Sequence, residues 1–236
     1  MENIITTWEE LEATVLSAGM LPYFRNKIPG FSVEENVPEN ILWDITSGPW
    51  DWKGSVTRNM KVAYGKFFNG RAGYISVDCL PDFINVRRDK FPLHPGTEEA
   101  RIYDILVQNE SLLSKELKNR AGYLLPRKPR KSANPFENMP EIGSKQTVKL
   151  TDSRFETALT RLQVGGYVVI ADFEYLYDRQ GNRYGWGVAR YTTPEAFYDI
   201  TTPDCPPYES FRRLCRRLRG VLPDASPVAI ANFIHK

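Results

Sequence analysis

Three predicted helices followed by a β-hairpin, over residues 97–191, constrain the fold of this 236-residue chain most. Residues 97–122 are expected to form two helices, the first capped by Thr97 and the second beginning at Ser111. A capping box of Ser153 and Glu156 predicts the third helix. Aromatic and β-branched residues then alternate on both sides of a turn that contains Gly181. This order is typical of a winged helix, although the segment between the second and third helices is longer than the usual turn.

The rest of the chain predicts further helices and a second hairpin, so the expected fold class is α+β, with winged helix-turn-helix units and β-hairpins. Thr7 and Glu10 have the spacing of a capping box for a helix over residues 7–19. Asn69-Gly70 suits a type I′ turn between two strands. Residues 80–96 are expected to be a turn-rich connection. We predict an N-terminal α+β region with an aromatic hairpin at 1–95, a winged-helix domain at 96–200 and a basic C-terminal helical segment at 201–236.

Charge is distributed unevenly along the chain. Residues 1–50 hold eight acidic and two basic side chains, a net charge of −6, whereas the whole chain carries +2. The remaining residues therefore carry +8. A basic body of this kind indicates an anionic partner. DNA is the partner that we expect.

Other partners and sites are not expected from the composition. No run of 18 apolar residues predicts a membrane span. The N-terminus lacks a basic segment followed by an apolar stretch, so a cytoplasmic location is expected. Two histidines and three scattered cysteines offer no spacing that suits a metal site. No glycine-rich phosphate loop is present, and we expect no cofactor.

Three segments supply candidate contacts to DNA. A proline-rich loop before the third helix holds four basic residues, which suit phosphate contacts or a plain linker equally well. The third helix and the tip of the following hairpin supply the others, and an arginine at such a tip can enter a minor groove. The role of a basic helix over residues 209–222 stays open. The candidate DNA-binding residues are Arg127, Lys128, Arg130, Lys131, Arg154, Thr157, Arg161 and Arg183.

The stretch "PWDWK", residues 49–53, contains the residue types that removal of a base from DNA requires. Trp50 and Trp52 are candidates for stacking on a base, and Asp51 is the candidate catalytic acid that stabilises a sugar cation or activates water. In an extended stretch the two tryptophans face one way, and Asp51 and Lys53 face the other. The alternative is that both tryptophans pack in a core, where this residue type is usually found.

Four stretches of the sequence resemble the AlkZ-related family of bacterial proteins. They are "GPWDWKG", "AYGKFFNGRAGYIS", "TRLQVGGYVVIADF" and "YGWGVARYTTPE", spread over residues 45–197. This family is linked to the AlkZ-type DNA glycosylases. The resemblance implies tandem winged helices with a β element, DNA binding, and a relation to enzymes that release alkylated or crosslinked bases.

The sequence departs from the glycosylases at their catalytic motif. AlkZ-type enzymes use a short Gln-x-Asp or Gln-x-Gln motif, and none of the four glutamines here, Gln108, Gln146, Gln163 and Gln180, is followed in that way. A DNA-binding protein related to glycosylases, acting in repair, is therefore the leading hypothesis. An active glycosylase and a protein-interaction module that does not bind DNA are the alternatives.

Overall fold

The computed structural model describes residues 4–44, 48–123, 125–126, 147–148, 153–181 and 183–235, and it confirms an α+β fold. The helices are α1 (Trp8–Ala18), α2 (Val33–Asn36), α3 (Glu39–Leu42), α4 (Pro49–Arg58), α5 (Leu80–Lys90), α6 (Glu98–Asn109), α7 (Ser114–Arg120), α8 (Ser153–Val164), α9 (Pro194–Tyr198), α10 (Pro207–Val221) and α11 (Pro227–His235). The strands are β1 (Met20–Pro22), β2 (Val62–Phe68), β3 (Arg71–Ser76), β4 (Ser111–Leu113), β5 (Leu125–Pro126), β6 (Thr147–Val148), β7 (Val169–Tyr177) and β8 (Arg183–Thr192).

A six-stranded antiparallel sheet lies at the centre of the molecule, with the strand order β1-β3-β2-β7-β8-β4. Each half of this sheet is built in the same way. A helix leads into a short strand, further helices follow, and a hairpin closes the half by pairing its last strand with the short one. In the first half these elements are α1, β1, α2, α3, α4, β2 and β3; in the second they are α6, β4, α7, α8, β7 and β8. The same topology therefore occurs twice along the chain.

The two halves meet where β2 pairs with β7, in a register that sets Tyr64 opposite Ile170. Tyr64 is buried there, and its ring contacts Tyr74 of the neighbouring strand and Phe173 of β7, at centroid distances of 5.0 and 5.7 Å. Aromatic contacts of this kind stabilise a packed interface beyond the area that they bury. A single core therefore runs across the junction of the two halves.

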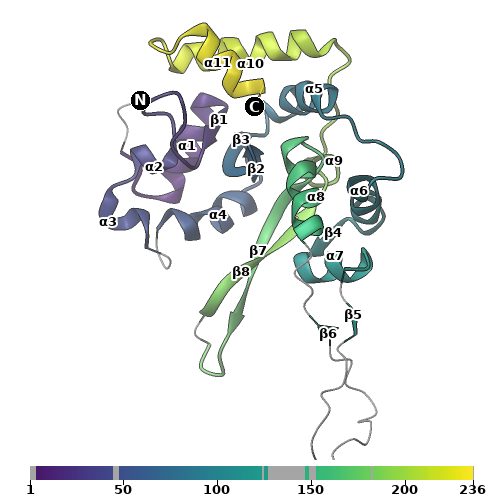
Figure 1. Ribbon diagram of the computed structural model, residues 1–236. Coiled ribbons are helices and arrows are strands. Elements are labelled where there is room, and N and C mark those ends of the chain that lie inside the picture. Colours follow the sequence, from purple (N-terminus) through teal and green to yellow (C-terminus); the bar gives the residue numbers. More distant parts are fainter. Residues whose placement is uncertain are drawn as a thin grey trace, which may run out of the picture.

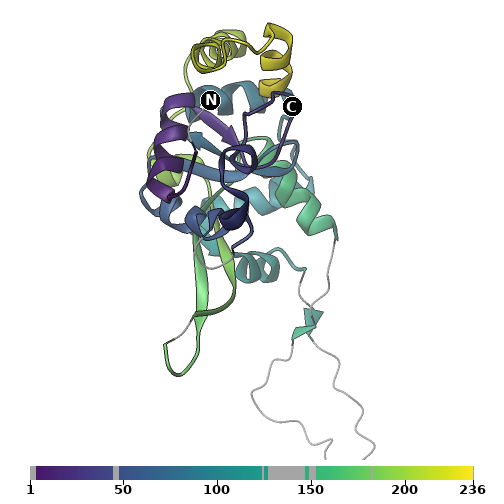
Figure 2. The ribbon, with the colours of Figure 1, turned by 90° about the vertical axis from the view of Figure 1, so that its left-hand side faces the viewer.

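The helix that precedes each hairpin packs against the other half. Helix α4 contacts β7, and α8 contacts β2. Buried Gln163 of α8 accepts a hydrogen bond from the backbone N–H of Lys66 in β2, at 3.0 Å. The β7–β8 hairpin extends beyond the body of the molecule, away from the end that α10 and α11 cover (Figures 1 and 2).

Several local predictions are confirmed by the structure. Thr7 caps α1 and Thr97 caps α6, each accepting a hydrogen bond from a backbone N–H of the first turn. Asn69 and Gly70 both have positive φ, at 53° and 71°, as a type I′ turn requires. The Glu10 carboxylate, however, accepts from the N–H of Thr6 rather than Thr7, so the expected capping box of α1 is only half formed.

Two local predictions are wrong. Residues 80–90 form helix α5 rather than a turn-rich connection, because Pro81 lies in the first turn, where a helix needs no N–H donor. Ser111 does not begin a helix. It pairs with Thr192 as the first residue of β4, and α7 starts at Ser114, because the sheet supplies the hydrogen bonds that a helix would have made.

The C-terminal helices are held to the body through a buried arginine. Arg87 of α5 is 0% exposed and donates to the carbonyls of Phe67 in β2 and His235 in α11, at 3.0 and 3.1 Å. Its guanidinium lies 4.8 Å from the ring centroid of Phe83. Burial lowers the pKa of Arg87 to about 10, so the side chain stays charged at neutral pH and continues to donate to both carbonyls.

None of the helices in the described part of the chain combines the length and the apolar character needed to cross a membrane.

A matched pair of glycine substitutions tests the packing of the first hairpin. A Cβ on Gly73 of β3 would lie 2.4 Å from the Phe68 ring and 3.0 Å from the Leu21 carbonyl oxygen, whereas one on Gly220 of α10 would meet nothing within 4 Å. We expect Gly73→Ala to lower the free energy of unfolding by about 1–3 kcal/mol. Gly220→Ala should raise it by about 0.5–1 kcal/mol, since alanine favours a helix. Urea unfolding followed by circular dichroism measures both; equal effects of the two variants would contradict the Gly73 packing.

Candidate nucleic-acid interface

Helix α8 presents a polar face to solvent. Arg154, Thr157 and Arg161 are exposed on it, whereas Phe155 and Leu159 point into the core. This division follows from the helical spacing of its apolar residues. The exposed side chains border a cavity of about 520 Å³ together with the N-terminal turn of α6. Three of the predicted DNA-binding residues therefore lie together on one accessible surface.

Arg161 shares this surface with an acidic residue of α6. Its guanidinium forms an ion pair with Glu99 at 2.9 Å, while 71% of the Arg161 side chain remains exposed. An exposed pair of this kind contributes little to stability, about 0–1 kcal/mol. The arginine is therefore held in place without being removed from solvent, and Glu99 reduces the positive potential of the face.

Arg183 lies near the outer end of the hairpin, but its side chain faces α4. It forms an ion pair with Asp51, and its guanidinium lies 3.5 Å from the centroid of the Tyr175 ring. Insertion of Arg183 into a minor groove would require it to leave both contacts. The pair Arg183–Asp51 joins β8 to α4. A second ion pair, between Arg58 and Asp172 at 2.8 Å, joins α4 to β7 of the same hairpin.

The stretch at residues 49–53 is helical, so its side chains do not alternate as in a strand. Trp52 is buried, with 7% of its surface exposed. Trp50 is partly buried and packs on Tyr23, with ring centroids 4.6 Å apart. Neither indole stands free on the surface as a stacking platform. The cap of this helix is Gly48, and Pro49 occupies its first turn.

Lys53 lies between aromatic rings from both halves of the molecule. Its ammonium is 4.4 Å from the ring centroid of Phe173 and 5.3 Å from that of Trp50. Burial lowers the pKa of Lys53, and the charge of Arg183 acts in the same direction, while Asp51 opposes them. The ion pair of Asp51 is made by Arg183 of the second hairpin and not by the neighbouring Lys53.

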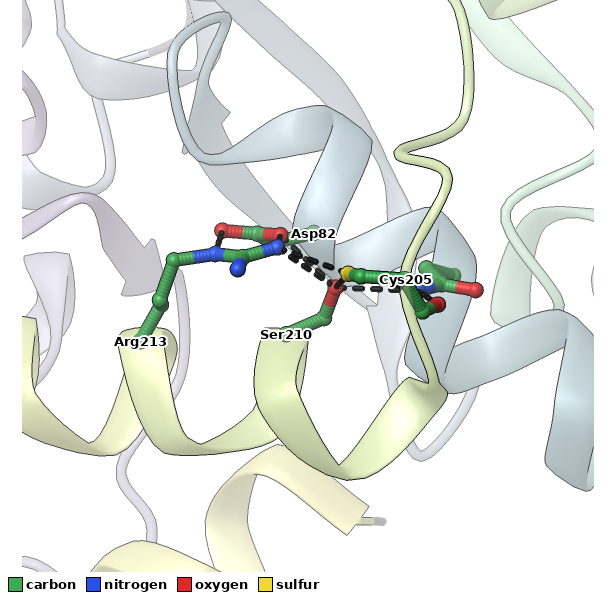
Figure 3. Close-up of polar contacts among 5 residues, drawn as sticks. Asp82, Cys205, Ser210 and Arg213 are labelled. Atoms are coloured by element: carbon green, nitrogen blue, oxygen red, sulfur yellow. Dashed lines mark hydrogen bonds and ion pairs between the residues drawn. The ribbon is translucent and has the colours of Figure 1, made fainter.

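A second polar cluster joins α5 to α10 (Figure 3). Arg213 binds the Asp82 carboxylate through two nitrogens, at 2.8 and 2.5 Å, and the buried Ser210 hydroxyl donates to the same carboxylate at 2.7 Å. Asn85 donates to Ser210 and to the carbonyl of Cys205. The Asp82 carboxylate is thus neutralised by Arg213 and bound by a buried hydroxyl. The geometry of the cluster is that of a structural joint between two helices.

Some of the predicted residues lie outside the described part of the chain. They are Arg127, Lys128, Arg130 and Lys131. Among the residues that are described, no three His, Cys, Asp or Glu side chains come together as a group that could hold a metal ion. Sequence reasoning missed Glu99 and Tyr175 as members of this region, because both meet their partners through the fold and not through local spacing.

The structure is that of an α+β protein built from two halves of the same topology. The exposed polar face of α8 and the projecting β7–β8 hairpin both belong to the second half. The family model described as AlkZ related matches residues 5–235, and the chain belongs to this family. The match extends well beyond residues 45–197, where the resemblance is visible by eye. Comparisons with curated proteins and with solved structures give no match.

Two tryptophan substitutions separate a core role from a surface role. Trp52 is 7% exposed and Trp43, which follows α3, is 57% exposed. We expect Trp52→Ala to cost about 3–5 kcal/mol of stability, the usual effect of removing a large buried ring. Trp43→Ala should stay within about 0.5 kcal/mol. Chemical denaturation measures both, and a Trp52→Ala protein as stable as the Trp43→Ala protein would show that the buried indole is not part of the core.

Proposed function

We propose that the protein is a winged-helix protein of the cytoplasm that binds DNA and acts in DNA repair. The observation that carries this proposal is the repeated topology, in which a short strand after the first helix pairs with the last strand of a closing hairpin. In winged-helix proteins the helix before the hairpin is the one that enters the major groove. By this correspondence α8 is the recognition helix of the second unit, within residues 96–200, and α4 takes the same place in the unit within residues 1–95.

The surface chemistry of α8 supports the choice of the second unit for DNA contact. Arg154, Thr157 and Arg161 are exposed there, and arginine and threonine side chains commonly contact phosphates. The four basic residues in the segment 127–131 are proposed as further phosphate contacts. Helix α4 is less suited, because Trp52 is buried and Asp51 is paired with the hairpin. Membership of the AlkZ-related family is consistent with a relation to DNA glycosylases.

Salt dependence tests DNA binding directly. Each phosphate that a basic side chain neutralises releases about 0.9 of a counterion from duplex DNA, so affinity should fall steeply as salt rises. We expect fluorescence anisotropy with a labelled duplex to show this, and replacement of the four basic residues at 127–131 by alanine to flatten the slope by a few units. Absence of binding at low salt would exclude the proposal and favour a protein-interaction module.

The Arg161–Glu99 ion pair provides a matched test of where the DNA lies. Arg161→Gln and Glu99→Gln break the same contact, so any effect on stability should be similar and small. Their effects on the surface charge are opposite. We expect Arg161→Gln to weaken duplex binding and Glu99→Gln to strengthen it, each by about 2- to 10-fold at low salt. If both variants change DNA affinity in the same direction, α8 is not the DNA-contacting face.

An active glycosylase is the second candidate, and the cluster around Asp51 is the observation that favours it. A half-buried carboxylate, an amine and aromatic rings occur together there, from Asp51, Lys53, Trp50 and Tyr175. These are the groups that hold a base and stabilise a sugar cation. Against this, Arg183 already neutralises Asp51, and the sequence lacks the Gln-x-Asp or Gln-x-Gln motif.

We expect the wild-type protein to release no alkylated base from duplex DNA above the uncatalysed background. Multiple-turnover assays with a DNA that carries an alkylated purine measure this. Asp51→Asn is the matched variant, since it keeps the shape of the side chain and removes its charge. Base release by the wild type that disappears in Asp51→Asn, with DNA affinity retained, would establish the enzyme and overturn our expectation.

A further inference from the structure

A cavity of about 580 Å³ lies beside the first hairpin, and no residue of α8 lines it. Its wall is formed by the loop that follows β1, by the turn between β2 and β3, and by helix α11. Cavities of roughly 300–1,000 Å³ are typical of small-molecule sites. None of the residues considered so far as DNA-binding or catalytic candidates lines this cavity.

The charged groups of the cavity all have the same sign. Arg25, Lys27 and Arg71 line it, and none of the described residues that line it is acidic. The side chains of these three cations form no ion pair or hydrogen bond with any residue that the structure describes. The carboxylate of Glu34 lies beside them and accepts from the backbone N–H of Arg25, at 2.8 Å, so it offsets one of the three positive charges in part and leaves the cavity net positive. Three cations that line one cavity without a side-chain partner among the described residues suit an anion of high charge, such as a phosphate monoester.

The remaining wall suits a flat ring with a polar edge. Phe24, Phe68 and Phe233 line the cavity, and the last two stack on each other at 4.9 Å. The amides of Asn69 and Asn232 also line it and make no side-chain hydrogen bond to a described residue. An amide can pair with the donor and acceptor groups at the edge of a nucleobase, and a phenylalanine ring can pack on its face.

The loop that carries two of the cations is held in place by its own contacts. Asn26 donates to the carbonyl of Phe31 at 2.6 Å and accepts from the N–H of Ile28 at 2.8 Å. Ile28 is buried. Arg25 and Lys27 are therefore presented from a structured loop, which lowers the entropic cost of binding.

We propose that this cavity binds a nucleoside monophosphate unit, with its phosphate held by Arg25, Lys27 and Arg71 and its base packed against the phenylalanine rings. Such a unit can come from a free nucleotide or from the 5′-phosphorylated end of a DNA strand. The site is separate from the proposed contact of α8 with duplex DNA, and it does not depend on that contact.

Isothermal titration calorimetry of the 236-residue chain tests the site with four probes. They are deoxyadenosine 5′-monophosphate, deoxyadenosine, inorganic phosphate and a short 5′-phosphorylated single strand. We expect the monophosphate to bind at least about tenfold more tightly than the nucleoside or inorganic phosphate, because only it provides both the charge and the ring. Binding of the single strand but not of the free nucleotide, lost in the variants below, supports the site with a strand end as its source.

Charge variants show whether binding occurs in this cavity. Arg25→Ala and Arg71→Ala should each weaken monophosphate binding by about tenfold. The matched control is Arg216→Ala, which removes an exposed arginine from α10 and should leave binding unchanged. All three residues are exposed, so thermal unfolding should change little and a loss of binding cannot be assigned to misfolding.

A second pair of variants changes the cavity from α11. Val228 is 68% exposed and lines the cavity. Val228→Glu adds a negative charge there and should weaken monophosphate binding, whereas Val228→Gln adds a side chain of the same size without charge and should weaken it much less. The proposal is overturned if no phosphate-bearing probe binds, if inorganic phosphate binds as tightly as the monophosphate, or if the cavity variants bind as the wild type does. These experiments test the cavity even if α8 does not bind duplex DNA, because no residue of α8 lines the cavity.

Discussion

The pairing of β2 with β7 is the constraint on which the rest of the structure depends. It joins two three-stranded halves into one sheet at the pair Tyr64–Ile170. Because the pairing is antiparallel, the turns that follow β2 and β7 lie at opposite ends of the junction. It also brings the helix before each hairpin onto the strand of the other half. Neither half therefore buries the helix before its hairpin, α4 or α8, without the other half.

This exchange explains how the charged groups are distributed. Asp51 of α4 pairs with Arg183 of the second hairpin, and Arg58 pairs with Asp172. The inner strand of each hairpin, β2 or β7, thus lies beside the helix that precedes the hairpin of the other half. The cluster that looked like a stacking site with an acid is in this view the contact between two repeats. On the exposed side of α8, by contrast, the ion pairs stay within the second half: Arg161 pairs with Glu99 of α6, and Glu156 pairs with Lys118 of α7.

The sequence was most informative where a local rule decides the structure. Thr7 and Thr97 cap their helices, and Asn69-Gly70 forms the predicted turn, because each depends on residues a few positions away. Predictions from local sequence were wrong where contacts with distant parts of the chain decide the secondary structure. Ser111 looks like a helix start, but its backbone pairs with Thr192, which is 81 positions further along the chain. The prolines in residues 80–96 indicated turns, although a proline in the first turn leaves a helix such as α5 intact.

The candidate site was harder to predict than the fold. Periodicity alone places Arg154 and Arg161 on the outside of their helix, because Phe155 and Leu159 define its buried side. The partner of Asp51 lies 132 positions away in the sequence, and the cavity beside Arg25 and Arg71 is closed by the last helix of the chain. No spacing rule connects such residues. Only the sheet junction and the packing of α11 bring them together.

The distance along the chain between the central strands has a consequence during synthesis. About a hundred residues separate β2 from β7, so the edge of β2 has no partner until the second half has left the ribosome. At about 5–20 residues per second this interval lasts roughly 5–20 s. During that time a strand rich in aromatic residues is open to pairing with other chains. The nascent first half is therefore the stage at which β2 is most open to pairing with a wrong strand, and its pairing with β7 in the completed sheet ends that stage.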